Sequence, residues 1–216
     1  MRPVSFSVLH ELDGWDLFWA RLEEIPGSEE KLAALRLSTG ERVRSALSLE
    51  SLPAHPVAAA MRRLFRAAGC DPTRYRPSSE ALLRRVLKGE DLPAIHPFVD
   101  VNNCLSVALA VPCCVAAEGS FAPPVTLRAG RPGESYESLR GPFNLEGKPL
   151  LADPAGPFSS PITDSQRVRV SDGTRRVWMV AYLPRGVVAL ETAAEVLDGL
   201  LSAVPVAEIE EAGVSR

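Results

Sequence analysis

The sequence predicts an α+β fold, with helices in the first half packed on a mainly antiparallel or mixed sheet from the second half. In the first half and again near the C-terminus, apolar residues recur every three or four positions, which is the helical period. From residue 125 onward, short apolar runs alternate with loops rich in proline and glycine, a pattern typical of strands. No internal repeat is visible, and 216 residues are enough for one sizeable core. We therefore expect residues 1–216 to form a single domain.

The N-terminal part, residues 1–60, is expected to be mainly helical after an opening strand. Residues 4–8 alternate apolar and polar side chains, which predicts an edge or first strand. Residues 29–49 place apolar side chains at helical spacing, but Thr39 and Gly40 interrupt the run. Because glycine inside a helical pattern is typical of a break, we predict two short helices separated by a turn.

Three more helices are expected in the first half. Residues 58–68 place apolar side chains three or four apart, with arginines on the other faces. Ser78 is the expected N-cap of a second helix, which ends near Gly89. The length of residues 98–109 and their content of small apolar side chains predict a largely buried helix closed by Pro112. These helices are expected to cover the sheet.

The second half is expected to supply the sheet and a last helix. Residues 190–201 return to helical spacing, after which the chain ends in a polar tail. Short apolar runs bounded by turn residues indicate where the strands lie. Four such runs predict strands: residues 125–129, 150–152, 168–170 and 177–183.

The composition is that of an ordinary globular protein. The hydrophobic fraction of 46% and the charged fraction of 24% exclude a disordered chain and a coiled-coil rod. No stretch approaches the roughly 20 apolar residues that a membrane-spanning helix needs. The N-terminus also lacks the apolar run and cleavage site of a secretion signal. We therefore expect a cytoplasmic protein without membrane contact.

The cysteines and histidines do not form a disulfide or metal-binding pattern. No CxxC spacing occurs and two cysteines are adjacent, so we expect reduced thiols. A nucleophilic thiol is the less favoured alternative, because no histidine is adjacent to act as a base. The histidines are too scattered to be metal ligands, so no metal and no cofactor are expected. These residues are Cys70, Cys104, Cys113, Cys114, His10, His55 and His96.

Positive charge is concentrated in one part of a chain whose formal net charge is −3. Between residues 61 and 88, eight basic residues face only two acidic ones, a local excess of six positive charges. Such a basic stripe could contact a phosphate backbone. The alternative is that these side chains are the solvated outer faces of helices. The basic residues are Arg62, Arg63, Arg66, Arg74, Arg76, Arg84, Arg85 and Lys88.

Four stretches of the chain together carry a family resemblance. They are RPSSEALLRRV (residues 76–86), VDVNNCLSVALAVP (99–112), VTLRAGRPGESYESLRG (125–141) and LADPAGPFSSPITDSQRVRVSDGTRRVWMV (151–180). In this order they resemble the B3/B4 domain of bacterial phenylalanyl-tRNA synthetase beta subunits and its free-standing relatives. The resemblance covers about residues 61–183, which we take as the family-like core.

The resemblance implies an activity and a partner. In the synthetase, this domain hydrolyses the ester that joins a wrong amino acid, tyrosine, to the terminal adenosine of tRNA. A second pocket of this kind is needed because binding alone cannot reject near-isosteric amino acids. A free-standing copy is expected to edit in trans and to need its own tRNA contacts, while no DNA contact is expected. The basic stripe offers these contacts: Arg62, Arg66, Arg84, Arg85 and Lys88.

The resemblance also places candidate site residues. Asn103 matches the asparagine of the family's Val-Asp-x-x-Asn helix and is a catalytic candidate, together with Asp164 near the family's acidic pocket residue. Ser165, which follows Asp164, and Arg76 are candidate substrate-binding residues. Cys114 stands where the family has a histidine, so it is expected to line the pocket and to alter the preference for tyrosine. An asparagine bonded only to neighbouring backbone is the alternative for Asn103.

An aminoacyl ester is already activated, so hydrolysis needs a positioned water and hydrogen-bond donors more than a strong base. A metal-independent aminoacyl-tRNA deacylase is therefore the leading hypothesis. The alternative is a non-catalytic module of the same fold that binds tRNA, another RNA or a free amino acid.

Overall fold

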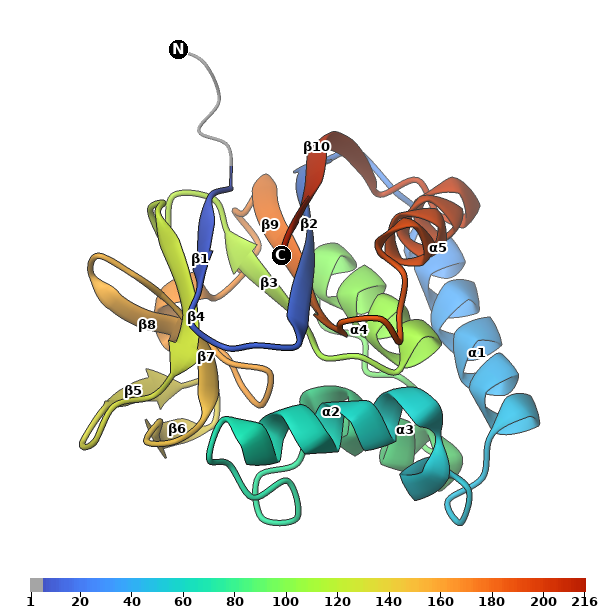
Figure 1. The fold of residues 1–216 in the computed structure, drawn as a ribbon. Helices are drawn as coiled ribbons and strands as arrows, with labels where there is room; N and C mark the ends of the chain where they lie inside the picture. The colour runs from blue at the N-terminus through green and yellow to red at the C-terminus, as the bar shows by residue number, and fades with distance from the viewer. Residues whose placement is uncertain (1–5) are drawn as a thin grey trace.

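Two four-stranded sheets form the framework of the computed structural model, which describes residues 6–216 (Figure 1). The outer sheet has the order β1-β4-β7-β8, in which only the β1–β4 pairing is parallel. The central sheet has the order β10-β2-β9-β3 and is antiparallel throughout. The strands of the outer sheet are Val8–His10, Val125–Ala129, Pro149–Asp153 and Gly156–Ser159. Those of the central sheet are Ala207–Ser215, Trp15–Glu24, Arg176–Pro184 and Cys113–Ala117.

Five α-helices in the described residues surround the central sheet. In Figure 1, α1, α4 and α5 lie on one side of this sheet, and the outer sheet lies on the other. A small hairpin of β5 (Ser135–Ser138) and β6 (Gly141–Asn144) extends from the outer sheet. The helices are α1 (Glu29–Ala46), α2 (Pro56–Ala67), α3 (Ser78–Leu87), α4 (Pro97–Leu109) and α5 (Leu190–Ala203).

The central sheet is buried on both faces. Along β9, Val177, Met179 and Ala181 pack among the helices. The alternate residues Trp178 and Tyr182 pack toward the outer sheet. Each large apolar side chain buried in this way stabilises the fold by about 1.5–3 kcal/mol. The sheet is thus a rigid support for the residues at its β3 edge.

The fold class is confirmed as α+β, and so are several predicted elements. The predicted helices correspond to α2, α3, α4 and α5, and α4 ends at Ala110 in a left-handed conformation. Ser78 is the first residue of α3 rather than its cap, because Pro77 occupies the N-cap position. The apolar runs at residues 125–129, 150–152 and 177–183 correspond to β4, β7 and β9.

The N-terminal part is less helical than expected, because β2 lies at the centre of the main sheet. Both faces of β2 are buried, so its sequence lacks the apolar–polar alternation of a half-buried strand. The sheet therefore does not come from the second half alone. The strand predicted for residues 4–8 lies partly outside the described residues, and β1 begins at Val8.

The predicted break in the first helix was wrong, since α1 is continuous. Thr39 and Gly40 are both buried, on a helix that packs against α4 and α3. A glycine inside a helix costs about 1 kcal/mol relative to alanine. Tertiary packing of the helix offsets that local preference.

Two other predictions near the C-terminus were wrong. The expected strand at residues 168–170 is instead the end of the 3-10 helix η2 (Gln166–Val168) and an irregular segment. The expected polar tail is β10, an edge strand whose residues alternate between exposed and half-buried. Only the pairing of β10 with β2 identifies this polar segment as a strand.

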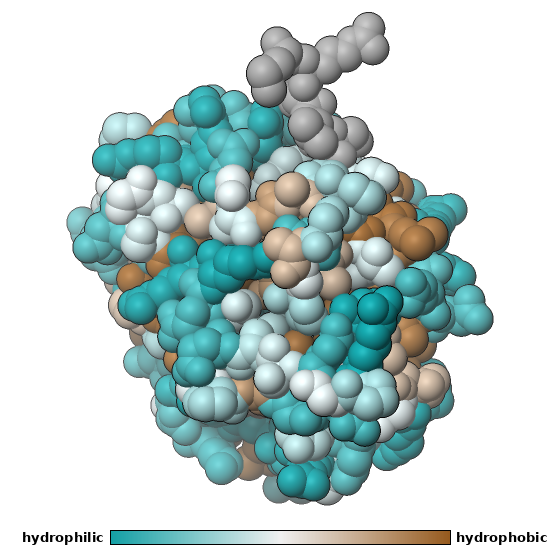
Figure 2. Space-filling model, turned by 90° about the vertical axis from the view of Figure 1, so that its left-hand side faces the viewer, coloured by the Kyte–Doolittle hydropathy of each residue, from teal (hydrophilic) through white to brown (hydrophobic). Residues whose placement is uncertain are grey.

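The face that Figure 2 presents is mainly hydrophilic, with small and separate hydrophobic spots. This is the outer-sheet side of the molecule. Within residues 6–216, the helices fall short of the length and apolar content that a membrane-spanning helix requires.

Candidate active site

Two adjoining hollows open at the β3 edge of the central sheet. The larger hollow, of about 640 Å³, lies between α3, α4, β3 and the loop that follows β8. The smaller hollow, of about 400 Å³, lies between α3, the loop before it and the β5–β6 hairpin. The two hollows share part of their lining, including Arg85, Asn103, Cys113 and Arg140. They therefore form one groove with two compartments.

Asp164 lies on the wall of the larger hollow and is half-buried. Ser159 Oγ donates a hydrogen bond of 2.7 Å to Asp164 Oδ1, and Ser159 Oγ lies 2.9 Å from the Tyr182 hydroxyl oxygen. Burial raises the pKa of Asp164 to about 7, although hydrogen bonds from the Ser159 side chain and the Ser160 backbone oppose this shift. A carboxyl group with a pKa near neutrality can accept or release a proton under physiological conditions.

The loop that presents Asp164 is fixed by its own hydrogen bonds. Ser160 Oγ donates to the Thr163 carbonyl oxygen at 2.9 Å and accepts from the backbone N–H groups of Ile162 and Thr163. The Tyr136 hydroxyl, from β5, donates to the same Thr163 carbonyl oxygen at 2.5 Å. The Leu139 backbone N–H donates to the Asp164 carbonyl oxygen at 3.0 Å. Asp164 therefore sits on a braced turn, which is the kind of support that a functional carboxyl group needs.

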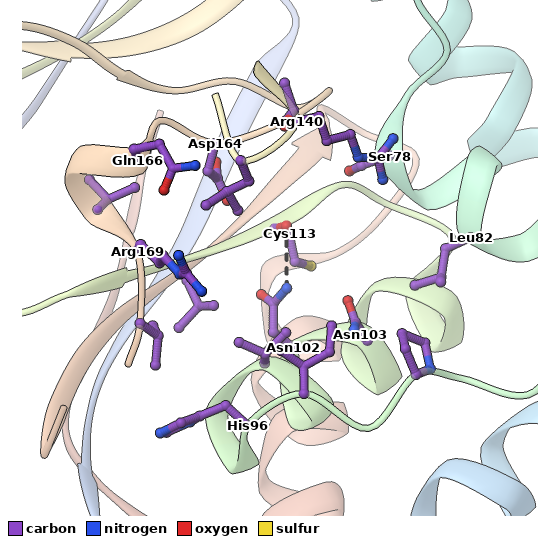
Figure 3. A pocket seen from close by; sticks show the side chains of 18 of the residues that line it. Ser78, Leu82, His96, Asn102, Asn103, Cys113, Arg140, Asp164, Gln166 and Arg169 are labelled. Atoms are coloured by element: carbon purple, nitrogen blue, oxygen red, sulfur yellow. Dashed lines mark hydrogen bonds between the residues drawn. The ribbon is translucent and has the colours of Figure 1, made fainter. Parts of the chain in front are cut away.

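Helix α4 contributes two consecutive asparagines to the groove. Asn103 is half-buried and lines both hollows. Asn102 is buried, lines the larger hollow and donates from Nδ2 to the Cys113 carbonyl oxygen at 3.4 Å. Figure 3 shows both asparagines on one side of Cys113, with Asp164 and Gln166 on the other. The helix and the loop thus face the groove from opposite sides of β3.

Asn102 is the residue of this pair that the sequence did not single out. Its Oδ1 is buried and has no hydrogen-bond partner among residues 6–216. An unsatisfied buried acceptor costs about 1–3 kcal/mol. Two adjacent asparagines in a mainly apolar helix were the available sequence signal.

Cys113, and not Cys114, lines the groove. Successive residues of a strand point to opposite faces, so Cys114 is buried on the side of β3 that faces the outer sheet. There it lies in the same buried cluster as Tyr182. Burial raises the pKa of both cysteines well above the ordinary value, so both remain thiols. The expected pocket-lining role of Cys114 therefore falls to its neighbour.

The two other candidates for substrate binding lie at the margin of the site. Ser165 is buried and caps η2, where its Oγ accepts from the Arg167 backbone N–H at 3.2 Å. Its neighbour Gln166 lines the larger hollow instead. Arg76 lines the smaller hollow, and its Nε lies 3.4 Å from Glu80 Oε1.

The basic stripe is divided by a buried carboxylate, Glu80, which is 2% exposed. Arg62 donates two hydrogen bonds of 2.7 Å to Glu80, and Arg84 donates one of 3.1 Å. Arg62 therefore joins α2 to α3, whereas Arg84 pairs with Glu80 within α3, so Glu80 engages both guanidinium groups. Arg66 and Lys88 are exposed but line neither hollow.

Arg85 is the one member of the expected RNA-binding set that lines the groove in the described residues. Its Nε donates to Glu90 Oε2 at 2.9 Å, in a pair that is half exposed on both sides. Arg140, at the turn of the β5–β6 hairpin, lines both hollows, and Arg169 lines the larger one. The sequence did not single out these two arginines, because only the folded hairpin and loop bring them to the groove.

Within residues 6–216, no three histidine, cysteine, aspartate or glutamate side chains come together in a way that could hold a metal ion. The polar groups of the groove are carboxyl, amide, thiol and guanidinium groups. They can bind and orient an acyl group, an amino group or a phosphate.

Fold and site together define an α+β domain with a two-part basic groove at one edge of its central sheet. The sequence matches the family model of the B3/4 domain over residues 60–196. This match spans more than half of the chain, and the chain belongs to the B3/4 domain family. The resemblance inferred from the sequence is thereby confirmed.

One solved structure to which the chain is similar is an N-terminal fragment of the phenylalanyl-tRNA synthetase beta-subunit from Pyrococcus horikoshii. The sequence identity is 16% and the TM-score is 0.48. The similarity covers 98% of this chain and 50% of the other, so this chain spans about half the length of that fragment. A search among curated proteins found no match.

Proposed function

We propose that this protein is an aminoacyl-tRNA deacylase that hydrolyses mischarged tRNA in trans, in the cytoplasm, as a single domain and without a metal ion. The family membership relates the domain to tRNA synthetases, and the groove supports the hydrolytic step. The observation that carries the proposal is Asp164, a carboxyl group in the larger hollow that has a pKa of about 7.

In the proposed reaction, the Asp164 carboxylate takes a proton from a water molecule as the water oxygen attacks the ester carbonyl carbon. The Asn103 side-chain amide donates a hydrogen bond to the carbonyl oxygen, where negative charge develops. The bond between the carbonyl carbon and the ribose oxygen then breaks, and the leaving oxygen takes the proton. Water is consumed, and a free amino acid and a deacylated tRNA are released.

The lining of the larger hollow fits an amino-acid side chain better than a second charged group. Its apolar lining includes Leu82 on α3, Val99 on α4 and Val115 on β3, together with residues of the surrounding loops. Asn103 lies where the two hollows meet. An ester held near Asn103 can therefore direct its acyl group into the larger hollow and its ribose toward the smaller one.

The test is a deacylation panel. The purified protein is incubated with tRNAs that each carry a different non-cognate amino acid, and ester loss is followed against a buffer control. Selective release that is lost in Asn103→Ala and Asp164→Asn supports the proposal and identifies the substrate. The matched control is Asp198→Asn, at an exposed position on α5, which is expected to leave the rate unchanged.

A deacylation panel in which no ester is released also decides between the two functions. If no aminoacyl ester is released while tRNA binding is retained, the hydrolase proposal is overturned. The protein is then better described as a binding module of the same fold that keeps the groove without the chemistry.

A further inference from the structure

Two buried hydroxyl groups, those of Ser159 and Tyr182, lie behind Asp164. Ser159 is the last residue of β8 in the outer sheet, and Tyr182 lies on β9 in the central sheet. Ser159 Oγ is 2.7 Å from Asp164 Oδ1 and 2.9 Å from the Tyr182 hydroxyl oxygen. Both residues are 0% exposed. This hydroxyl pair therefore connects both sheets to the carboxyl group on the wall of the larger hollow.

The protons of the hydroxyl pair fix the direction of its hydrogen bonds. A serine hydroxyl has a single proton to donate. Ser159 donates it to Asp164, so the proton of the second hydrogen bond comes from the Tyr182 hydroxyl. Successive hydrogen bonds polarise one another in a low-dielectric interior, so donation from Tyr182 strengthens the bond from Ser159 to the carboxylate. The hydroxyl pair therefore stabilises the ionised form of Asp164.

The hydroxyl pair also fixes the orientation of the carboxyl group. Because Ser159 occupies Oδ1, Oδ2 is the Asp164 oxygen that is left to face the larger hollow. Ser159 lies on β8, which pairs with β7, and Tyr182 lies on β9, which is flanked by β2 and β3. The Tyr182 ring packs edge to face against Trp15, with centroids 6.2 Å apart. Donors on packed strands hold a functional group in one direction better than donors on loops.

The other titratable groups packed behind Asp164 carry no charge at neutral pH. Burial raises the pKa of the Tyr136 hydroxyl on β5, the Cys114 thiol on β3 and the Tyr182 hydroxyl well above their ordinary values. Within residues 6–216, Asp164 forms no ion pair, so hydrogen bonds provide the direct stabilisation of its charge. The titratable residues on the groove side are Arg85, His96, Cys113, Arg140, Arg169 and Asp172.

We propose that Ser159 and Tyr182 are positioning residues for the reaction at Asp164. Ser159 holds the carboxylate with Oδ2 toward the larger hollow, and Tyr182 holds the Ser159 hydroxyl in the direction in which it donates. Both act through Asp164, because their side chains are buried and line neither hollow. Their part in the reaction rests on the proposed deacylase function, whereas their effect on the carboxyl group does not.

The first experiment follows the NMR signal of the Asp164 carboxyl carbon as the pH is varied, with Asp164→Asn to assign the signal. Ser159→Ala removes the donor to the carboxylate and is expected to raise the titration midpoint by about one pH unit. Tyr182→Phe removes only the second hydroxyl and is expected to raise the midpoint by about half as much. If Ser159→Ala does not fold, Ser159→Cys keeps a weaker donor at the same position and is expected to shift the midpoint in the same direction.

The matched control is Tyr136→Phe, which makes the same chemical change beside the same loop. The Tyr136 hydroxyl donates to the Thr163 carbonyl oxygen and not to the carboxyl group of Asp164. This variant is expected to lower the melting temperature as Tyr182→Phe does, but to leave the titration midpoint within about 0.2 pH unit of the wild type. Equal midpoints in the Ser159, Tyr182 and Tyr136 variants overturn the inference, and so does a lowered midpoint in Ser159→Ala.

The second experiment measures single-turnover ester release on the substrate that the panel identifies. With its midpoint about one pH unit higher, Ser159→Ala is expected to lose about fivefold in rate at pH 7 and to return to within about twofold of the wild type at pH 9. A merely structural role of Ser159 would lower the rate equally at both pH values.

The two experiments separate this inference from the proposed function. If the midpoints move as expected and the wild type releases no ester, the proposed function fails and the control of Asp164 by the hydroxyl pair stands. If ester release has the same pH dependence in all variants, the inference fails and the proposed function stands.

Discussion

Glu80 and Asp164 are two carboxyl groups of the same domain with opposite surroundings. Burial acts to raise the pKa of Glu80, but hydrogen bonds and charge from Arg62 and Arg84 lower it below its ordinary value. Asp164 receives hydrogen bonds only from neutral donors, and burial raises its pKa to about 7. The first group is held as a carboxylate by its cations, whereas the second remains able to exchange a proton near neutral pH.

The comparison distinguishes a carboxyl group with a structural role from one that can take part in proton transfer. Glu80, which is surrounded by arginines, joins α2 to α3 through Arg62. It pairs with Arg62 and Arg84, which the sequence analysis had proposed as RNA contacts. A carboxyl group without a cation, on a braced loop at the wall of a hollow, is the kind of perturbed group that clusters at functional sites. The following variants test whether the two carboxyl groups have these different roles.

The largest effect is expected for Asp164→Asn. If Asp164 accepts a proton from the attacking water, the variant loses general base catalysis, a contribution of about 10²–10⁴-fold. The measurement is the single-turnover rate of ester loss at pH 8 on the substrate that the panel identifies. A rate within a factor of about three of the wild type would show that Asp164 is only a structural group.

Glu80→Gln is expected to act on stability. The variant leaves three converging arginines without their carboxylate and should lower the free energy of unfolding by about 2–3 kcal/mol. This is less than for a fully buried pair, because the arginines are partly exposed. Urea denaturation measures the change. The control is Glu90→Gln, which removes the half-exposed ion pair with Arg85 and should lower the free energy of unfolding by less than about 1 kcal/mol. Equal losses of unfolding free energy in the two variants would contradict the structural role of Glu80.

The free energy of unfolding should depend on pH because of the raised pKa of Asp164. Its folded pKa of about 7 lies above the unfolded value, so the stability it contributes is fully present below about pH 4 and is lost as pH rises through 7. Wild type and Asp164→Asn should therefore diverge between about pH 4 and 7, with the variant gaining at most about 4 kcal/mol relative to the wild type at the upper end. Urea denaturation at several pH values checks this, and parallel profiles for the two proteins would argue against a raised pKa.

The smallest effect is expected for Arg66→Glu. Arg66 belongs to the basic stripe but lies outside both the Glu80 cluster and the two hollows. RNA affinity should change by less than about twofold, because only long-range and screened charge is altered. Fluorescence anisotropy titration with a single-stranded RNA compares the affinity of Arg66→Glu with that of Arg140→Glu, at a residue that lines both hollows. A larger loss of affinity in Arg66→Glu would indicate that the surface of α2 is the RNA contact.

The sequence predicted the elements whose periodicity is set by one buried face. The amphipathic α2 and α3 are of this kind, whereas β4, β7 and β9 were predicted as short apolar runs bounded by turn residues. It missed β2, whose apolar run is interrupted by Asp16 and Arg21, and β10, a polar edge strand without an apolar run. The sequence also predicted a break at Gly40 in α1, where packing against other helices outweighs the low helix propensity of glycine.

The candidate site was predicted in part for a related reason. Asn103 and Asp164 were selected from motif position, and the structure places both on the wall of the larger hollow. Cys114 was selected one residue away from the cysteine that lines the groove. A motif places a residue along the chain, but the register of β3 decides which of two neighbours faces the groove.

By itself, the sequence determined the α+β class, most helices, the B3/4 family and the two polar residues Asn103 and Asp164. Only the tertiary structure decided which charges pair with one another, because Arg62 and Glu80 lie on different helices and meet through packing. It also decided which arginines remain available at the groove and which carboxyl group is buried without a cation. These properties depend on distance and burial between segments far apart in the chain, and no local pattern of residues encodes either one.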